Sequence, residues 1–362
     1  MEFEKTTPER QLLARAAQKR RPASGTLELS PLCNLNCDMC YVRLSRAEME
    51  AQGRLRTAEE WISLAEQMER AGVLFLLLTG GEPLLYPGFR ELYAKLKRMG
   101  FILAVNTNGT MIDEDWADYF AAKKPRCVNI TLYGADGAAY ERLCHAPDGF
   151  ERTMRGIRLL RERGIDVRVG ASVTRENRAD VGRIAEIARE YGAALNIDPY
   201  MTPAVRERTK PFDEQARLAP EEAARVRVES MRRELGETQF RLYADAIVYA
   251  VKQDVLPKSE DMSCQAGRCS FAVNWQGQMR PCVMLQQPSV PVFDVGFEEA
   301  WRTVSQGVEA IRISPKCVSC AMRPLCHTCA ASAYWETGDC GGVPEYLCRY
   351  AEETARLLEE EK

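Results

Sequence analysis

Polar, helix-like stretches alternate with short apolar runs along most of the first 200 residues. Four of these stretches end in a charged turn and a glycine, and an apolar run follows: "MERAGVLFLLL", "KRMGFILAV", "RERGIDVRVGASV" and "REYGAALNI". Their glycines suit the left-handed position that ends a helix: Gly72, Gly100, Gly164 and Gly192. The runs that follow are rich in leucine and β-branched residues, which is typical of buried parallel strands.

The helix that ends at Gly72 carries two further signals. Thr57 and Glu60 have the spacing of a capping box, which predicts that the helix begins there. Apolar residues then recur at helical spacing and predict one stripe that faces the core: Trp61, Leu64, Met68 and Ala71.

Two more segments, "TLELS" (26–30) and "CVNITLYG" (127–134), complete a set of about six strands that alternate with helices. Repeated strand–helix units predict a parallel sheet with right-handed crossovers. Periodicity alone leaves two arrangements open, an open sheet and a sheet that closes part-way into a barrel. In both arrangements ligands bind at the carboxyl ends of the strands.

Composition and charge narrow the classes of protein. The 362 residues are enough for one large domain and a smaller one, and the net charge of −3 implies no general attraction to nucleic acid or to anionic membranes. The longest apolar run, "VLFLLL" (73–78), is far shorter than the roughly 20 residues of a membrane helix. The charged N-terminus lacks the apolar centre of a secretion signal, so we expect a cytoplasmic protein without nucleic-acid or membrane partners.

Fourteen cysteines are unusual in such a protein. A reducing cytosol disfavours disulfides, so clustered cysteines there more often bind metal or take part in chemistry. Three lie between residues 33 and 40, and nine lie between residues 264 and 348. Only Cys127 and Cys144 fall in the middle of the chain, and we interpret both as small buried apolar residues.

Three motifs follow the first three strands. "CNLNCDMCY" (33–41) follows the first strand, "TGGEP" (79–83) the second and "NTNGT" (106–110) the third. Three thiolates are one short of a closed four-coordinate metal site. A glycine pair alone is weak evidence, and Asn108 with Gly109 also fits a simple turn. The pair gains weight because Glu82 and the cysteines would face the same mouth of the sheet.

Taken together, these motifs and the repeated domain resemble the radical S-adenosylmethionine (SAM) superfamily. The resemblance implies that Cys33, Cys37 and Cys40 hold three irons of a [4Fe–4S] cluster, and that SAM binds the fourth iron through its amino and carboxylate groups. Reductive cleavage of SAM would then give methionine and a 5′-deoxyadenosyl radical, which removes a hydrogen from the substrate. The fold that we expect is α/β: a partial (β/α)6 barrel of parallel strands with a small C-terminal cysteine-rich iron–sulfur domain.

The resemblance also implies roles in SAM binding. Gly80, Gly81, Glu82 and Pro83 match the segment that receives the methionine amino group, and the Glu82 carboxylate would accept from the ammonium. Tyr41 matches the aromatic position beside adenine. Three further residues complete the expected cofactor-binding set: Asn108, and Thr131 and Ser172, which would reach the ribose. Threonine and serine are also common in strands for their propensity alone. No catalytic acid or base is assigned.

The C-terminal third resembles the SPASM domain, which carries two auxiliary iron–sulfur clusters in many radical SAM enzymes. The resemblance assigns one cluster, expected to be [4Fe–4S], to Cys264, Cys269, Cys282 and Cys329. It assigns a second to Cys317, Cys320, Cys326 and Cys348. Cys340 is left over, as a spare residue or an alternative ligand. Cys326 and Cys329 are separated by two residues, whereas the commonest pattern has three, so this partition is less firmly fixed than the assignment of the domain.

We therefore divide the chain into an N-terminal extension (1–25), a radical SAM domain (26–200), a bridge (201–258) and an auxiliary-cluster domain with a C-terminal helix (259–362). About 25 residues before the first strand are too few for a fused leader-binding domain. A separate leader-recognition protein is expected as a partner, together with a reductant of the flavodoxin or ferredoxin type.

Three classes of function are compatible with the cysteines: a radical SAM enzyme, a multi-cluster electron carrier, and a zinc-ribbon binding protein. The "GGEP" motif favours the enzyme. Its expected substrate is a peptide or protein side chain that acquires a thioether or carbon–carbon crosslink, or a related oxidative modification. The alternative is a small molecule in cofactor biosynthesis. A sulfatase-maturase-like role is less favoured, because Tyr133 stands where those relatives usually have an acidic residue.

Overall fold

The computed structural model describes residues 7–202, 206–208, 217–253, 259–262, 264–326 and 329–361. Its framework is one nine-stranded sheet with the strand order β6-β5-β4-β3-β2-β1-β7-β8-β9. The first six strands are parallel to their neighbours and lie in sequence order. These strands are β1 (Ser24–Glu28), β2 (Phe75–Thr79), β3 (Ile102–Thr107), β4 (Cys127–Thr131), β5 (Val167–Ser172) and β6 (Ala194–Asp198).

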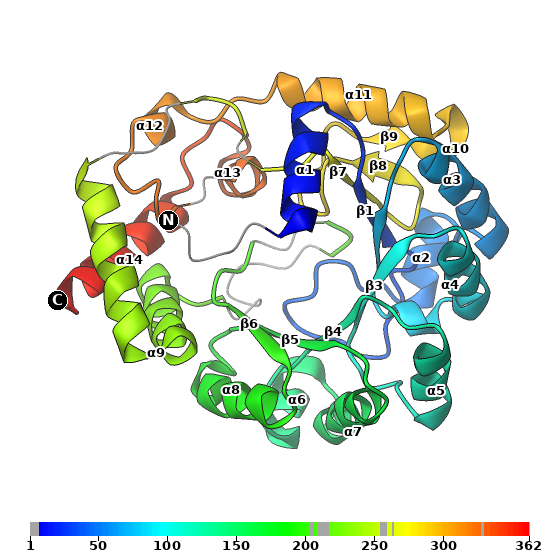
Figure 1. Ribbon diagram of the computed structural model, residues 1–362, viewed down its shortest axis with the longest axis horizontal. Coiled ribbons are helices and arrows are strands. Elements are labelled where there is room, and N and C mark those ends of the chain that lie inside the picture. The colour runs from blue at the N-terminus through cyan, green and yellow to red at the C-terminus, as the bar shows by residue number, and fades with distance from the viewer. Residues whose placement is uncertain are drawn as a thin grey trace.

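Helices connect these strands and lie on the outside of the curved sheet (Figure 1). They are α2 (Arg46–Gln52), α3 (Ala58–Arg70), α4 (Phe89–Arg98), α5 (Glu114–Ala122), α6 (Gly137–Cys144), α7 (Gly149–Glu162) and α8 (Val181–Glu190), with the short 3₁₀ turns η1 (Pro83–Leu85) and η2 (Arg178–Asp180). The predicted parallel α/β fold is confirmed. The sheet curves but does not close, because β6 and β9 remain its two edges.

Local signals in the sequence correctly mark where the helices end. The glycines at 72, 100, 164 and 192 have φ values of 87°, 90°, 67° and 58°, which a residue with a side chain rarely adopts. The capping box of α3 is present, since Thr57 and Glu60 bond reciprocally. Trp61, Leu64 and Met68 are buried as predicted, whereas Ala71 lies just beyond the helix and is half-buried.

The C-terminal region continues the same sheet. Strand β7 (Ser270–Val273) pairs in parallel with β1, and β8 (Gln278–Arg280) returns antiparallel to β7 through a turn at Gly277, whose φ is 90°. Strand β9 (Val290–Pro291) follows β8, and α10 (Val292–Val295) and α11 (Phe297–Glu309) come next. Side chains from β7, β8 and α11 share one hydrophobic core with the barrel, so the sheet and its core cross the boundary that we placed near residue 259.

The remaining helices are α1 (Pro8–Gln18), α9 (Pro220–Gln253), α12 (Pro315–Val318), α13 (Ala330–Thr337) and α14 (Glu345–Glu360). Helix α9 is broken at Gly236, where φ is 72°, and it packs along α14 (Figure 1). Val228, Phe240 and Ala244 of α9 form a buried cluster with Ala351 and Leu358 of α14. The bridge is therefore held by the last helix of the chain. Its residues 203–205, 209–216 and 254–258 lie outside the described residues.

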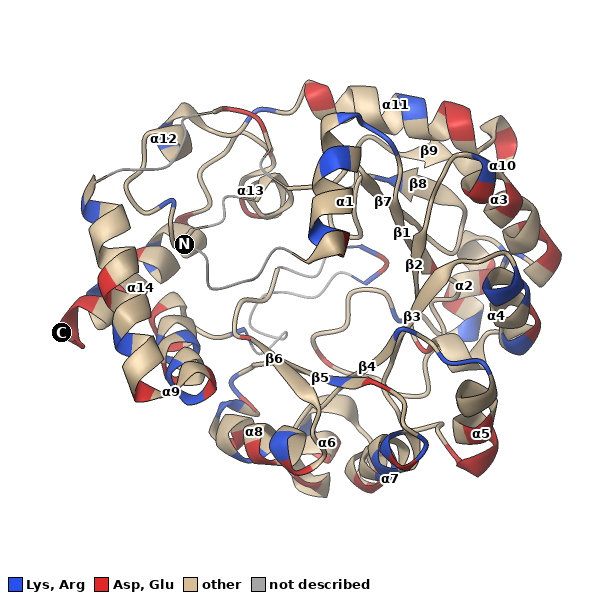
Figure 2. Ribbon diagram, in the orientation of Figure 1, with Lys and Arg blue, Asp and Glu red and all other residues tan. Residues whose placement is uncertain are grey.

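Charged side chains lie mainly on the outer helices, and the strands carry few of them (Figure 2). Helix faces that pack on the sheet are apolar, whereas the solvent faces carry mixed charges, as in an ordinary α/β domain. None of the described helices is long and apolar enough to cross a membrane.

Trp61 provides a test of this core. Its side chain is fully buried and meets the ring of Phe293 edge-on, with 5.3 Å between ring centroids. Trp61→Ala should lower the free energy of unfolding by about 3–5 kcal/mol, because it leaves a large cavity. Tyr249→Ala is the control, since Tyr249 is 64% exposed on α9 and its loss should change stability by less than about 0.5 kcal/mol. Urea unfolding of anaerobically prepared protein measures both, and equal midpoints would contradict the prediction.

Candidate active site at the carboxyl ends of the strands

The loop that carries the first three cysteines leaves the carboxyl end of β1 and rests against the end of α6. The backbone N–H groups of Asn36 and Asp38 donate to the carbonyls of Cys144 and Leu143, at 3.1 and 3.0 Å. The Asp38 carboxylate also lies 2.9 Å from the imidazole of His145. The loop has no regular secondary structure, and these contacts hold it in place.

N–H groups are directed at two of the three sulfurs. The Cys33 sulfur accepts from the N–H of Leu35 at 3.4 Å, and the Cys40 sulfur accepts from the N–H of Arg43 at 3.3 Å. Burial raises the pKa of Cys33 to about 12 and also raises the pKa of Cys40. Thiols in such an environment stay protonated in the absence of a cation, and metal binding would displace their protons.

A fourth cysteine lies beside this group, which the sequence did not lead us to expect. The pKa of Cys37 is raised by a hydrogen bond with the thiol of Cys144 and by burial, and the Tyr133 side chain also hydrogen-bonds Cys37. We had interpreted Cys144 as an ordinary buried residue. It is fully buried, but it is also a direct neighbour of Cys37. No local pattern indicated this contact, because more than 100 residues separate the two cysteines.

The cysteine loop offers three thiols as cluster ligands. Within the described part of the chain, no three Cys, His, Asp or Glu side chains are grouped so that they could hold one metal ion. In an iron–sulfur cluster each thiolate binds a different iron. Cys33, Cys37 and Cys40 share one loop and are close enough for electrostatic interaction, so the donor set fits three corners of a cluster.

The glycine pair after β2 allows two loops to pack directly on each other. A Cβ atom on Gly80 would lie 2.4 Å from the carbonyl oxygen of Ser30, and one on Gly81 would lie 2.4 Å from that of Leu32. The N–H groups of Gly81 and Glu82 donate to the same two carbonyls at 2.7 and 2.8 Å. The glycines thus bring the loop after β2 against the start of the cysteine loop.

The Glu82 carboxylate has partners within the protein. It is fully buried, and it accepts from the N–H of Leu84 at 3.0 Å, the hydroxyl of Thr107 at 2.8 Å and the N–H of Asn108 at 2.9 Å. Burial raises the pKa of Glu82 to about 7. The sequence suggested that this carboxylate accepts from the SAM ammonium. In the structure it ties the loop after β2 to the end of β3.

Asn108 connects that end of β3 to the cysteine loop. Its amide nitrogen donates to the side-chain oxygen of Asn34 at 2.9 Å and lies 3.7 Å from the sulfur of Cys33. Its amide oxygen accepts from the N–H and the hydroxyl of Thr110. The "NTNGT" motif is therefore more than a turn, because it fixes the first cysteine from the side.

Thr131 and Ser172 line the same cavity, which has a volume of about 780 Å³. Its other polar lining residues are Asn106, Asn129, Asp166, Arg168, Asn196 and Asp198. Tyr41 follows the third cysteine directly and is partly buried, and its ring lies beneath the guanidinium of Arg206, 5.0 Å from the ring centroid. The structure does not bring Tyr41 into the group of residues that line this cavity.

Cys340 lies beside three cysteines that were expected to hold the first auxiliary cluster. Cys264, Cys282, Cys329 and Cys340 interact electrostatically, and Cys282 and Cys340 pack against the same hydrophobic cluster. Cys269, the other expected ligand, is fully buried directly before β7. Its carbonyl accepts from the N–H groups of Ala23 and Ser24, and burial raises the pKa of its thiol.

Three of the cysteines expected to hold the second cluster interact electrostatically. The pKa of Cys348 is raised by burial and by the neighbouring Cys317 and Cys320. Cys326, the fourth expected ligand, packs between two small hydrophobic clusters beside α9 and α14. It lines a second cavity of about 970 Å³ together with Cys329, β6 and α9.

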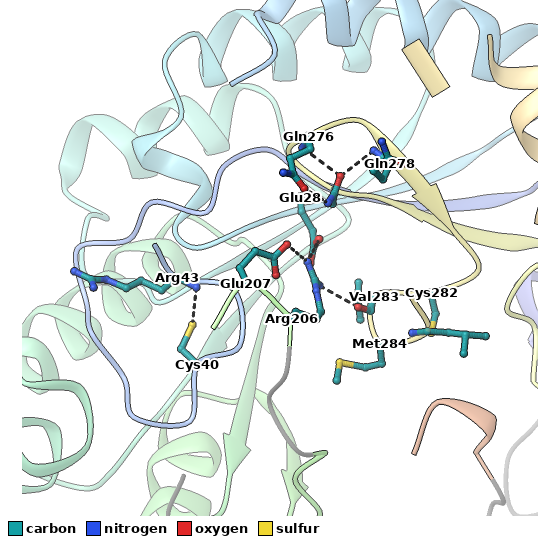
Figure 3. A network of polar contacts seen from close by, with 12 residues as sticks. Glu28, Cys40, Arg43, Arg206, Glu207, Gln276, Gln278, Cys282, Val283 and Met284 are labelled. Atoms are coloured by element: carbon teal, nitrogen blue, oxygen red, sulfur yellow. Dashed lines mark hydrogen bonds and ion pairs between the residues drawn. The ribbon is translucent and has the colours of Figure 1, made fainter. Parts of the chain in front are cut away.

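The sequence also did not predict a buried ion pair that lies near the cysteine loop. Glu28, the last residue of β1, binds Arg206 of the bridge through two contacts of 2.7 Å (Figure 3). A glutamate between the two leucines of the strand "TLELS" was the one available signal, since glutamate is rarely buried without a partner. Nothing local in the sequence indicated that Arg206 would be that partner.

Comparisons with known proteins agree with this geometry. Residues 27–188 match the family model described as the Radical SAM superfamily. The AdoMet-dependent heme synthase of Methanosarcina barkeri is 24% identical over 86% of this chain and 92% of its own length. The antilisterial bacteriocin subtilosin biosynthesis protein AlbA of Bacillus subtilis is 25% identical over 85% of this chain and 67% of its own length.

Among solved structures, SuiB of Streptococcus suis superimposes with a TM-score of 0.68 at 17% identity, covering 94% of this chain and 81% of SuiB. SuiB has also been solved with S-adenosylmethionine and with its precursor peptide SuiA. At this level of identity the likeness establishes a shared fold.

Glu82→Gln tests the structural role of the buried carboxylate. An amide would place an NH₂ group against one of three donors, so SAM-free protein should lose about 2 kcal/mol of stability. The matched control is Glu91→Gln, because Glu91 is an exposed glutamate on α4. Both are compared by urea unfolding without SAM. Unchanged stability in Glu82→Gln would instead assign the carboxylate to the cofactor.

The cysteine partition is tested by Cys340→Ala and Cys269→Ala. If the observed grouping reflects ligation, the Cys340 variant should lose up to one cluster's iron and the associated low-temperature EPR signal after anaerobic reconstitution. The Cys269 variant should retain both. The reverse result would restore the partition expected from the resemblance.

Proposed function

The chain belongs to the radical SAM superfamily, and we propose that it uses radical SAM chemistry to modify a side chain of a peptide or protein. The product would carry a thioether or carbon–carbon crosslink, or a related oxidative modification. When bound, the [4Fe–4S] cluster and SAM supply reductive cleavage of SAM and a 5′-deoxyadenosyl radical. The residues that would hold the cluster are Cys33, Cys37 and Cys40.

The observation that carries the peptide proposal is the 970 Å³ cavity beside β6. Strand β6 is an edge of the sheet, so its outer side is not paired with another strand. An extended peptide can pair with such an edge through its backbone and leave its side chains free to enter a cavity. Cys326 and Cys329 form part of the opposite wall, and an auxiliary cluster held there would supply an electron acceptor.

A peptide bound between β6 and the auxiliary cysteines could undergo an oxidative modification. A crosslink within a peptide removes two hydrogens, one as an atom taken by the radical and one as a proton whose electron passes to an acceptor. A substrate held between the barrel and the auxiliary cysteines can meet both requirements. We therefore propose two auxiliary iron–sulfur clusters, with Cys264, Cys282, Cys329 and Cys340 for one and Cys317, Cys320, Cys326 and Cys348 for the other.

Within the barrel, we propose that SAM lies over the loop after β2. The Glu82 carboxylate is hydrogen-bonded to the protein, so backbone carbonyls of the segment Gly80 to Pro83 would accept from the SAM amino group. Thr131 and Ser172 would face the ribose across the interior cavity. Tyr41 would contact adenine with the ring face that is turned away from Arg206. Asn108 would act by fixing the Cys33 loop.

Partners follow from this proposal. A reductant of the flavodoxin or ferredoxin type would deliver electrons, and a separate protein would recognise the leader of the peptide. The peptide complex of SuiB supports a peptide substrate for this fold.

A second candidate function is chemistry on a small molecule in cofactor biosynthesis. Proteins named AdoMet-dependent heme synthase match this chain over nearly their whole length, which favours this candidate. AlbA matches a similar share of the chain and supports the hypothesis that the substrate is a peptide.

The two candidates are separated by anaerobic incubation with SAM, dithionite and the short peptides encoded beside the gene, followed by mass spectrometry. We expect each crosslink to lower the peptide mass by about two units. The control is the triple variant Cys33→Ala, Cys37→Ala, Cys40→Ala, which should release no 5′-deoxyadenosine. Unchanged peptides, with a small metabolite consumed instead, would establish the second candidate.

A further inference from the structure

Three consecutive residues of the bridge, Arg206, Glu207 and Arg208, touch both cysteine-bearing parts of the chain. Arg206 and Glu207 lie between the carboxyl end of β1 and the loop after Cys282 (Figure 3), and Arg208 contacts the first cysteine loop at the carbonyl of Cys37. The bridge thus reaches into the mouth of the barrel at the point where the two parts meet.

Arg206 makes the central contacts. Its guanidinium donates to both oxygens of Glu28 at 2.7 Å, to Glu207 at 2.9 Å and to the carbonyl of Val283 at 3.0 Å. Val283 directly follows Cys282. The side chains of Arg206 and Glu28 are only 1% and 3% exposed, so the whole arrangement is shielded from water. The same guanidinium covers the ring of Tyr41.

Arg208 holds the other side of the cysteine loop. Its backbone N–H donates to the carbonyl of Tyr41 at 3.3 Å. Its guanidinium donates to the side chain of Asn36 and to the carbonyl of Cys37, both at 3.3 Å. Between them, Arg206 and Arg208 contact the loop at its second cysteine and at the residue after its third.

Stability alone is a weak reason for such an arrangement. Removing charges from water is costly, and a buried ion pair often stabilises a protein no more than apolar residues of the same size would. Arginine does offer something that apolar residues cannot, a rigid planar fork whose donors point in fixed directions. Here those directions lead to β1, to Glu207 and to the loop that carries an auxiliary cysteine.

We propose that Arg206 is a positioning residue that sets the Tyr41 end of the first cysteine loop relative to the Cys282 loop. Its guanidinium packs on one face of the Tyr41 ring and donates one N–H to the carbonyl of Val283. The ion pair with Glu28 at the end of β1 holds the guanidinium in place. This role rests on the proposed function, because it matters only if SAM and an auxiliary cluster act on one substrate. A lysine at this position keeps the charge but lacks the planar fork, so the ring and the loop would lose their common support.

Arg56 offers a matched comparison. It also joins the barrel to the C-terminal region, donating to Glu60 at 3.2 Å and to the carbonyl of Gln276 at 3.1 Å, and it lies over the ring of Phe293. It resembles Arg206 in bonding a carboxylate, a carbonyl and an aromatic face, but it contacts neither cysteine loop. If Arg206→Lys acted only by weakening the contact between the barrel and the C-terminal region, Arg56→Lys should therefore have the same effect.

The experiment compares Arg206→Lys, Glu28→Asp and Arg56→Lys as anaerobically reconstituted full-length enzymes. Iron content should equal that of wild type in all three. SAM is then titrated against the EPR spectrum of the reduced cluster. The concentration for half of the SAM-induced change should rise about tenfold in Arg206→Lys and Glu28→Asp, a typical effect for residues that orient the ligands of a metal site. It should stay within about twofold of wild type in Arg56→Lys.

A wild-type titration in Arg206→Lys, or equal shifts in Arg206→Lys and Arg56→Lys, would overturn the proposal. Unfolding or loss of iron in Arg206→Lys would also overturn it, because the residue would then be a support for the fold. These readouts need SAM but no substrate, so they remain decisive if the peptide proposal fails. Once the substrate is known, the ratio of product to 5′-deoxyadenosine should fall in the same two variants.

Discussion

The loops that leave β1 and β2 lie so close together that neither Gly80 nor Gly81 has room for a Cβ atom. This contact is the constraint on which the rest of the site depends. Two backbone hydrogen bonds between the loops place the start of the cysteine loop directly beside Glu82. From Glu82 the connection continues to Thr107 and Asn108 at the end of β3, and through Asn108 back to Cys33. Three strand ends and one cysteine are thus fixed relative to one another.

Polar groups without access to water carry much of this positioning. Glu82 is fully buried and takes three hydrogen bonds, and Glu28 is buried against Arg206. A buried polar group is costly unless each of its partners is in place, so such groups tolerate few alternative arrangements. The apolar core beneath the strands stabilises the fold, whereas these polar contacts determine how the loops lie on top of it.

The two ends of the six-stranded barrel differ. Beside β1, strand β7 adds a parallel strand, so the C-terminal region shares the sheet and the core of the barrel. Beside β6, the described part of the chain contributes no further strand, and β6 borders the cavity lined by α9, Cys326 and Cys329. Backbone hydrogen bonds therefore join the barrel to its neighbour at β1, whereas side chains surround the cavity at β6.

Features that depend on a few neighbouring residues could be predicted from the sequence. Helix-ending glycines and the capping box at Thr57 follow from local backbone geometry, and the alternation of strands and helices follows from periodicity. The order of the motifs along the chain also predicted that the three cysteines lie at one end of a parallel sheet. Three contacts became visible only in the folded chain: Cys144 adjoins Cys37, Cys340 lies beside Cys329, and Arg206 reaches Glu28. The physical reason is that each of these contacts joins segments that are separated in the sequence. Packing of the whole chain brings such segments together, and no short pattern records it.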